Sequence, residues 1–282
     1  MSNGSSGMNR TVTSGSAVAP WSIRNANRSS RGRYDDTEAG VSRQLPQPHL
    51  PRNTAMRTHA FAVALLAGAL LSTAAFAQVA EKANTGYKTK KDRARVARNL
   101  DNPDRVERQK PVELLESIGV DPGETIADIG TGVGFMLPYM IDAVGPSGRV
   151  YAEDIQDDFL DKVEQKAAEN GWKNVEIVKG AQKDVELPEN SVDLAFILDV
   201  YHHLNYPEET MATVYDAVKP GGRLAVIDFY RSREHPRMSE ERRKNHIRLD
   251  RDGFRKEIES VGFHFDRTFD HLPYQYVLMF RK

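Results

Sequence analysis

The sequence predicts an α/β fold in which a mostly parallel sheet lies between layers of helices. Two observations predict this fold. From Asp121 onward, apolar strand-like runs alternate with helix-like runs, and the chain ends on two strand-like runs that only Pro273 and Tyr274 separate. Alternation of this kind gives parallel strands with helices on both faces of the sheet, whereas two strands joined by a tight turn pair antiparallel. We therefore expect the last strand to run against the others.

Composition narrows the class of protein. The chain has 282 residues, no cysteine and a formal net charge of −1. A near-neutral balance argues against a general nucleic-acid or membrane-surface binder. Without cysteine there is no disulfide framework, no thiolate metal site and no cysteine nucleophile, and this composition suits an oxidising compartment.

The segment 1–55 is rich in Ser, Arg, Asn, Gly and Pro and has no helical or strand period. We predict that it is a disordered upstream extension, because its apolar surface is too small to offset the entropy of ordering. The biological start is then Met56. A transit peptide is the competing interpretation, and Asp35, Asp36 and Glu38 count against it.

Residues 56–77 have the three parts of a secretory signal peptide. A short basic start precedes the 12-residue apolar run Ala60–Leu71, and Ala75-Phe76-Ala77 matches a small-residue cleavage site. A run of this length is too short to span a bilayer. Residues 60–80, however, are 21 residues without a charge, so an uncleaved membrane anchor is the alternative interpretation. We expect cleavage before Gln78 and a periplasmic or secreted protein, with no stable membrane insertion afterwards.

The mature chain divides into a charged arm and one domain. Residues 78–110 form the predicted helical arm, whose basic residues would lie on a solvated face or grip an acidic partner. Residues 111–282 form the domain; Pro111 opens its first helix and Gly119 ends it. Further helices are expected at 134–144, 157–170, 207–218 and 250–261, and strands at 125–130, 149–155, 175–180, 192–200, 223–229, 263–272 and 275–281.

The central motif is the glycine turn Asp128-Ile129-Gly130-Thr131-Gly132-Val133-Gly134 between the first strand and its helix. Glycines let the backbone adopt dihedrals that a side chain forbids and approach a ligand closely. The helix that follows offers unpaired N–H groups. The spacing differs from that of the dinucleotide fingerprint, so the turn alone leaves both a cofactor site and a plain tight turn open.

Carboxylates follow the second and third strands. Asp154 lies 24 residues after Gly130, where nucleotide-binding α/β folds hold a ribose hydroxyl pair. Its neighbour Glu153 should point to the opposite side of the strand. Asp184 lies in the loop after the third strand and could accept a hydrogen bond from an exocyclic amine, or be an ordinary loop carboxylate.

The fourth strand closes on polar residues that we expect to line a reaction pocket: Asp199, Tyr201, His202 and His203. A histidine base or a structural hydrogen bond fits the two histidines. We predict no metal site, because neighbouring side chains on an extended strand diverge and no other Asp, Glu or His cluster has ligand spacing.

Taken together, these segments resemble a class I S-adenosylmethionine-dependent methyltransferase. The turn 128–134 is similar to the family's first motif, and Asp154 to the acid after its second strand. Residues 192–204 resemble the fourth-strand motif, and Lys219-Pro220-Gly221-Gly222 the turn before the fifth strand. Residues 254–263 resemble the helix and Gly-Phe turn before the terminal hairpin.

The resemblance covers roughly residues 103–282 and is broadly to small-molecule methyltransferases of the quinone-biosynthesis type. It implies a Rossmann-like, three-layer sandwich with a seven-stranded sheet whose seventh strand is antiparallel. It also implies methyl transfer from S-adenosylmethionine to a small-molecule acceptor by in-line displacement, in which the protein mainly positions and desolvates the reactants.

The resemblance also implies roles for individual residues. Asp128 would hold the cofactor's ammonium group, Asp154 its ribose and Asp184 its adenine amine. Tyr201, His202 and the more distant His246 could face the acceptor. The complete implied cofactor set is Asp128, Gly130, Thr131, Gly132, Gly134, Asp154, Ile155, Asp184 and Asp199. Two residues depart from the family's pattern. Pro138 is expected inside a helix, and Ala181 stands where relatives often carry an acid.

Two other classes of function stay open. One is a nicotinamide-dependent oxidoreductase, although the third glycine is one position early for it and the terminal hairpin does not belong to it. The other is a secreted protein that keeps the fold and binds a ligand or partner without catalysis. This alternative is considered because an export signal conflicts with a cofactor that is made in the cytoplasm.

Overall fold

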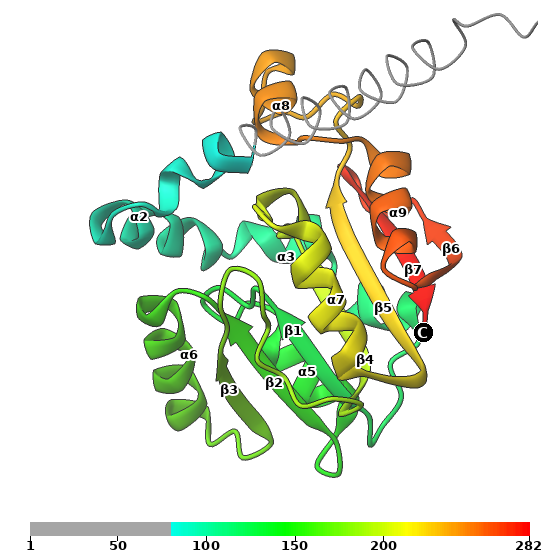
Figure 1. Ribbon diagram of the computed structural model, residues 1–282. Helices are drawn as coiled ribbons and strands as arrows, with labels where there is room; N and C mark the ends of the chain where they lie inside the picture. The colour runs from blue at the N-terminus through cyan, green and yellow to red at the C-terminus, as the bar shows by residue number, and fades with distance from the viewer. Residues whose placement is uncertain (1–79) are drawn as a thin grey trace, which may run out of the picture. The chain divides into compact units, whose positions relative to one another are not determined.

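The computed structural model describes residues 80–282, which contain a seven-stranded sheet with the order β3-β2-β1-β4-β5-β7-β6 (Figure 1). The predictions for residues 1–55 and 56–77 lie outside the described residues. Within 80–282, none of the helices has the length and apolar character that crossing a membrane requires. The strands are β1 Thr125–Ile129, β2 Arg149–Asp154, β3 Val175–Lys179, β4 Val192–Leu198, β5 Val218–Phe229, β6 His264–Phe269 and β7 Gln275–Arg281.

Helical segments precede the sheet and connect its strands. The two 3-10 helices of the described chain are η1 Asn84–Tyr87 and η2 Tyr201–His203. The α-helices are α2 Lys90–Leu100, α3 Asp104–Gln109, α4 Pro111–Ile118, α5 Leu137–Val144, α6 Asp157–Asn170, α7 Pro207–Ala217, α8 Glu240–His246 and α9 Arg251–Ser260.

Strand directions confirm the predicted topology. Strand β1 pairs in parallel with both β2 and β4, and β5 pairs in parallel with β4. Strand β7 lies between β5 and β6 and is antiparallel to both, as the short connection between the last two strands predicts. The α/β sandwich and its antiparallel last strand are therefore confirmed.

Helices cover both faces of the sheet, and the strand side chains divide between two cores (Figure 1). On β4, Ala195 and Ile197 face the core that α7 and α9 complete, whereas Phe196 faces the core formed with α4 and α5. Alternation along an extended strand produces this division. Each fully buried Leu, Ile, Val or Phe contributes roughly 1.5–3 kcal/mol, so the two cores account for much of the stability of the sheet.

Three local expectations need correction. Helix α5 begins at Leu137 rather than at residue 134, so Pro138 lies in its first turn, where a backbone N–H would have no intrahelical partner. Strand β5 begins at Val218, because Val218 already pairs with Val192 before the glycine turn. The short helix α8 (Glu240–His246), capped by the Ser239 side chain, has no counterpart in the sequence-based prediction.

The charged arm packs against the domain. Arg93 of α2 forms an ion pair of 2.8 Å with Asp158 at the start of α6. Asn84 of η1 donates a hydrogen bond of 2.9 Å to the backbone oxygen of His203. Lys166 of α6 reaches Asp101, just beyond α2, at 2.6 Å. These contacts hold the arm against the domain, whereas Lys90, Lys91, Arg95 and Arg98 of α2 are exposed, as predicted for a solvated basic face.

Candidate active site

A cavity of about 370 Å³ opens at the carboxyl ends of β1, β2 and β4. Strand β1 pairs with β2 on one side and β4 on the other, so the chain crosses over in opposite directions from this point. Ligands of open α/β sheets bind at such a topological switch point. The loops after these strands form the floor of the cavity, and η1, α2 and α3 supply further walls.

The glycine turn forms part of the floor. Gly130 and Gly132 have φ angles of 70° and 59°, a region that side chains disfavour. A Cβ at Gly130 would lie 2.6 Å from a methyl carbon of Val200. The two acids at the end of β2 fix the turn, since Gly130 N–H donates to Glu153 Oε2 at 3.1 Å and Gly132 N–H to Asp154 Oδ2 at 2.9 Å.

Asp128 is a buried carboxylate at the end of β1, with 3% of its surface exposed. Its Oδ2 accepts a hydrogen bond of 2.7 Å from the Thr131 hydroxyl. Burial raises the pKa of Asp128 to about 7, although the Thr131 hydrogen bond and the charge of Arg105 act in the opposite direction. Asp128 is therefore poised to ionise when a cation binds beside it.

The acids at the end of β2 are also buried. Burial raises the pKa of Asp154 to about 6, against hydrogen bonds from the backbone of Gln156 and Gly132. Burial and the charge of Asp154 raise the pKa of Glu153 well above its usual value. Both line the cavity, so the expectation that only Asp154 faces it is wrong. Glu153 reaches the floor by bonding the Gly130 amide.

The cavity carries an excess of acidic side chains. Its walls contain five acids and two bases, namely Glu81, Asp128, Glu153, Asp154 and Asp199 against Lys88 and Arg105. A ligand with net positive charge relieves the repulsion among these carboxylates, whereas a pyrophosphate increases it. The site therefore favours a cationic ligand over a dinucleotide.

Asp199, just after β4, is held by residues that are distant in sequence. It adopts a φ of 59°, which is uncommon for a residue with a side chain. Its carboxylate accepts hydrogen bonds from Gln109 and Gln275 and lies 3.9 Å from Arg105. Burial raises its pKa, against the charge of Arg105. No local motif marks Arg105, Gln109 or Gln275, so the sequence alone does not identify them as site residues.

Most residues of the predicted cofactor set line the cavity. Those that do are Asp128, Gly130, Thr131, Gly132, Asp154, Ile155 and Asp199. Gly134 does not; a Cβ there would meet Leu137 at 2.8 Å, so this glycine permits close helix packing. Asp184 also lies off the cavity, and its carboxylate accepts a hydrogen bond of 2.8 Å from the Glu186 amide. Ala181 and Gln182 take its expected place.

The Tyr-His-His segment is a 3-10 helix, η2, rather than the end of an extended strand. Tyr201 is fully buried and donates its hydroxyl to Glu257, so it does not face the cavity. His202 is also buried and does not line the cavity, whereas His203 does. The turn brings the rings of His202 and His203 to 4.1 Å between centroids, so the expected divergence is wrong.

His246, at the end of α8, joins the two histidines. Its ring centroid lies 4.8 Å from that of His202 and 5.3 Å from that of His203. It does not itself line the cavity. His202 and His246 therefore lie close together without lining the cavity, and His203 is the member of the group that reaches the cavity wall.

Tyr87 is the aromatic residue of the arm at the cavity. Its ring packs edge-on against Phe159 at 6.1 Å and His203 at 5.2 Å. Burial, with the charges of Asp154 and Asp199, raises the pKa of Tyr87 to about 12, so the phenol stays neutral. No sequence pattern singled out Tyr87, and its packing makes it part of the cavity wall.

Comparison with known proteins agrees with this geometry. Residues 127–226 match a family model described as a methyltransferase domain. The chain is 30% identical over 116 residues to a ubiquinone/menaquinone biosynthesis C-methyltransferase of Ectopseudomonas mendocina, covering 41% of this chain and 45% of that protein. It is 29% identical over 115 residues to an arsenite methyltransferase of Halobacterium salinarum, covering 41% of this chain and 29% of that protein.

A solved structure extends the similarity to the whole fold. A crystal structure of an S-adenosylmethionine-dependent methyltransferase from Aquifex aeolicus superposes with a TM-score of 0.61 at 29% identity, covering 66% of this chain and 96% of the other. The sheet order and this superposition show the Rossmann-like fold typical of class I methyltransferases, and residues 127–226 resemble a methyltransferase domain. The chain spans less than half the length of the curated relatives described above.

Proposed function

We propose that this chain is an S-adenosylmethionine-dependent methyltransferase that acts on a small-molecule acceptor. The observation that carries the proposal is the acidic cavity beside the glycine turn. S-adenosylmethionine has a sulfonium and an ammonium group against one carboxylate, so its net charge is positive. The buried acids of the cavity complement that charge, and the pKa of Asp128 near 7 leaves it ready to ionise.

The described residues fit the cofactor. Asp128 and the N–H groups of the glycine turn would bind its amino-acid end, and Asp154 its ribose hydroxyls. Gln182 lines the cavity in the loop where Asp184 was expected, and its side-chain amide suits the adenine amine. Asp154 already accepts two backbone hydrogen bonds, which hold its carboxylate in place.

The chemistry of the reaction comes from the cofactor, which supplies an electrophilic methyl group on sulfur when bound. The chain's own part is to position the acceptor and exclude water. Tyr87 and the arm line one side of the cavity, and the phenol stays neutral because its pKa is raised to about 12. His203 places a neutral imidazole on the wall, because burial and the neighbouring histidines hold its pKa well below the usual value.

The class of methyl acceptor is part of the proposal. The relatives named above methylate a quinone precursor or arsenite according to their names, which suggests a small molecule without choosing one. A cavity of about 370 Å³ has the size of a small-molecule site and is unlike an extended groove for a polymer.

Calorimetric titration of the purified protein with S-adenosylmethionine, S-adenosylhomocysteine and NAD tests the cofactor. We expect the two adenosyl ligands to bind and NAD not to bind. A matched test of catalysis follows conversion of S-adenosylmethionine to S-adenosylhomocysteine with a panel of quinols, phenols, thiols and arsenite. Binding without turnover across the panel would favour a non-catalytic ligand-binding protein, and tighter binding of NAD would favour the oxidoreductase.

We also propose that the protein is exported. The pattern in residues 56–77 supports export, and the intact acids of the cavity support retained cofactor binding after it. The two can be examined together by mass spectrometry of protein recovered from its native compartment, which reports both the N-terminus and any bound nucleoside. Recovery of cytoplasmic protein that still contains residues 56–77 would contradict export.

A further inference from the structure

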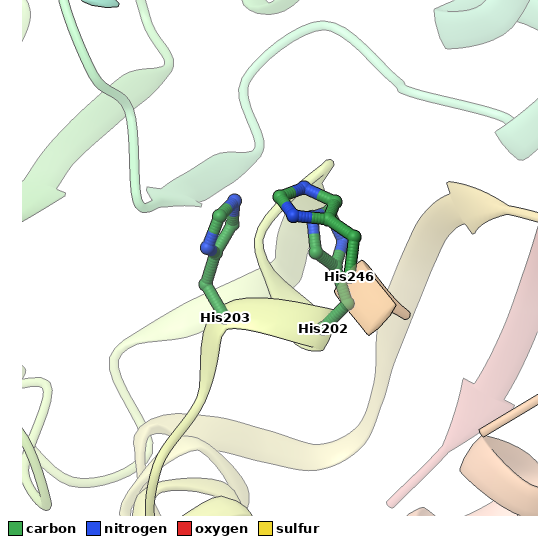
Figure 2. Close-up of side chains that lie close together, drawn as sticks. All are labelled: His202, His203 and His246. Carbon is green, nitrogen blue, oxygen red and sulfur yellow. The ribbon is translucent and has the colours of Figure 1, made fainter. Parts of the chain in front are cut away.

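Three imidazole rings meet next to the cavity, from two separate parts of the chain (Figure 2). His202 and His203 come from η2, and His246 comes from the last residue of α8. One ring nitrogen of each histidine lies within 4.8 Å of one nitrogen of each of the others. No sequence motif links the two segments, and no role in cofactor binding explains why three rings converge.

The hydrogen bonds of two rings decide which nitrogen of each is free. Asp228 Oδ1 accepts from His202 Nδ1 at 2.7 Å, and Asn84 Oδ1 accepts from His203 Nδ1 at 2.8 Å. The Asn84 amide is oriented by its own donation to the His203 backbone oxygen. Because both partners are acceptors, each Nδ1 carries a proton, and the neutral rings expose the Nε2 lone pair.

The free nitrogen of His202 has no partner among the described residues. Its Nε2 is buried and makes no hydrogen bond, and the whole residue is 1% exposed. A buried polar atom without a partner costs roughly 1–3 kcal/mol. A ligand would remove this cost, and ring nitrogens of the two other histidines lie close to the ring of His202.

We propose that His202, His203 and His246 bind one divalent transition-metal ion, with Zn²⁺ the best-suited common ion. Three neutral imidazoles with one open position are the ligand set of catalytic zinc sites. Asp228 and Asn84 supply the outer hydrogen bonds that fix the tautomer and orientation of metal-binding histidines. Asp228 is fully buried, and the cation would offset its charge through His202.

The spacing requires a small closure. Tetrahedral bonds of about 2.0–2.1 Å place ligand nitrogens about 3.3 Å apart, against the present limit of 4.8 Å. His246 can supply the movement, because within residues 80–282 its ring makes no hydrogen bond and it stands at the end of a seven-residue helix.

The metal site goes beyond the proposed methyl transfer and does not rest on it. His203 is shared between the cluster and the cavity wall, so the open position of the ion would border the space for the acceptor. An ion there would bind an oxygen or sulfur atom of an acceptor and favour its deprotonated form. Metal binding itself can be measured without cofactor or acceptor.

The competing explanation is a charged His202 that pairs with Asp228 and donates from Nε2 to a neighbouring ring. This arrangement is structural and needs no metal. The two explanations differ in one measurable respect. Removal of His246 abolishes a three-histidine metal site, whereas it leaves the pair of His202 and Asp228 in place.

The experiment uses the protein purified without a polyhistidine tag and stripped with a chelator. Calorimetric titration with Zn²⁺ should show one ion per chain, and bound Co²⁺ should give the visible absorption of a tetrahedral site. His246→Ala should weaken Zn²⁺ binding by at least about 100-fold, since even outer hydrogen-bond partners contribute 10–100-fold. The matched control is His264→Ala, an exposed histidine on β6, which should bind Zn²⁺ as the wild type does.

Absence of stoichiometric Zn²⁺ binding by the wild type would overturn the proposal, and so would equal binding by folded His246→Ala protein. Should that variant fail to fold, the Co²⁺ spectrum of the wild type still tests for a tetrahedral site, and an octahedral spectrum would overturn the proposal. Titration of the stripped protein with S-adenosylmethionine is a separate measurement. A chain that binds cofactor but no Zn²⁺ would refute the metal site alone, and the reverse result would refute the cofactor site alone.

Discussion

Replacing Asp128 by Asn should stabilise the protein without cofactor and abolish cofactor binding. The carboxyl is 3% exposed, and its pKa rises from 3.8 to about 7 in the folded state. Between these values the folded protein holds a proton that the unfolded chain has lost, so stability falls as pH rises through this window. Above pH 7 the cost is constant, and below pH 3.8 it is absent.

The size of the effect follows from the shift. A difference of about 3 pKa units at about 1.4 kcal/mol each gives a cost of up to about 4 kcal/mol at pH 8. Asn carries no charge, and its side-chain oxygen can still accept the Thr131 hydrogen bond. Each kcal/mol shifts Tm by about 2–4 °C in a domain of this size, so we expect a rise of several degrees at pH 8.

Thermal melts at pH 5 and pH 8, with and without S-adenosylmethionine, measure both effects. The gain of Asp128→Asn over the wild type should grow from pH 5 to pH 8, and cofactor should raise Tm only for the wild type. Asp142→Asn, at an exposed position of α5, is the matched control and should change neither quantity. A folded Asp128→Asn protein that is less stable at pH 8, or that keeps cofactor affinity, would refute the reasoning.

Three further outcomes are expected. Asp154→Ala should lower cofactor affinity by at least about tenfold, because hydrogen bonds to a carboxylate contribute roughly 1.5–3 kcal/mol, whereas Asp157→Ala, at an exposed carboxylate, should not. Gly130→Ala should destabilise the fold and weaken cofactor binding through strain of about 1–2 kcal/mol and a clash with Val200. Protein recovered from its native cell should begin at Gln78, as peptide mass spectrometry will show.

Each of these outcomes has a result that would contradict it. Equal affinity of Asp154→Ala and the wild type, measured by calorimetry, would remove the ribose assignment. Gly221→Ala is the matched control for Gly130→Ala. Gly221 also has a left-handed φ, of 78°, but a Cβ at this position would meet nothing within 4 Å. Equal melting temperatures of the two variants would show that close approach to Val200 is unimportant. A mature N-terminus within residues 1–55 would contradict signal cleavage.

The sequence pattern correctly predicted those helices and turns that residues close together in the chain determine. Helix α6 spans Asp157–Asn170, the range expected from sequence, because its apolar spacing and the following glycine both act within a few residues. The turn 128–134 lies where its glycines require. The predicted boundaries were wrong where strand pairing sets the end of an element. An example is Val218, whose partner Val192 is distant along the chain.

The site was predicted only in part, for a related reason. Asp128 and Asp154 lie at the carboxyl ends of β1 and β2, and the alternation of strands and helices predicts that these ends meet at one edge of the sheet. The prediction that Asp184 lines the cavity was wrong, because hydrogen bonds within the loop after β3 set its conformation and no sequence periodicity reveals them. One such bond is donated by the Glu186 amide to the Asp184 carboxylate. Gln182 has no signal in one sequence that distinguishes it from other loop amides.

The sequence by itself determined the alternation of strands and helices, the glycine turn, and the acids at the ends of β1 and β2, since each depends on residues close together in the chain. The tertiary structure alone decided that the charged arm closes the cavity and that three histidines converge. Asn84 and His203 are 119 residues apart, and His246 reaches them from a helix that no pattern predicted. Contacts over such separations arise from the packing of whole elements, which local periodicity does not encode.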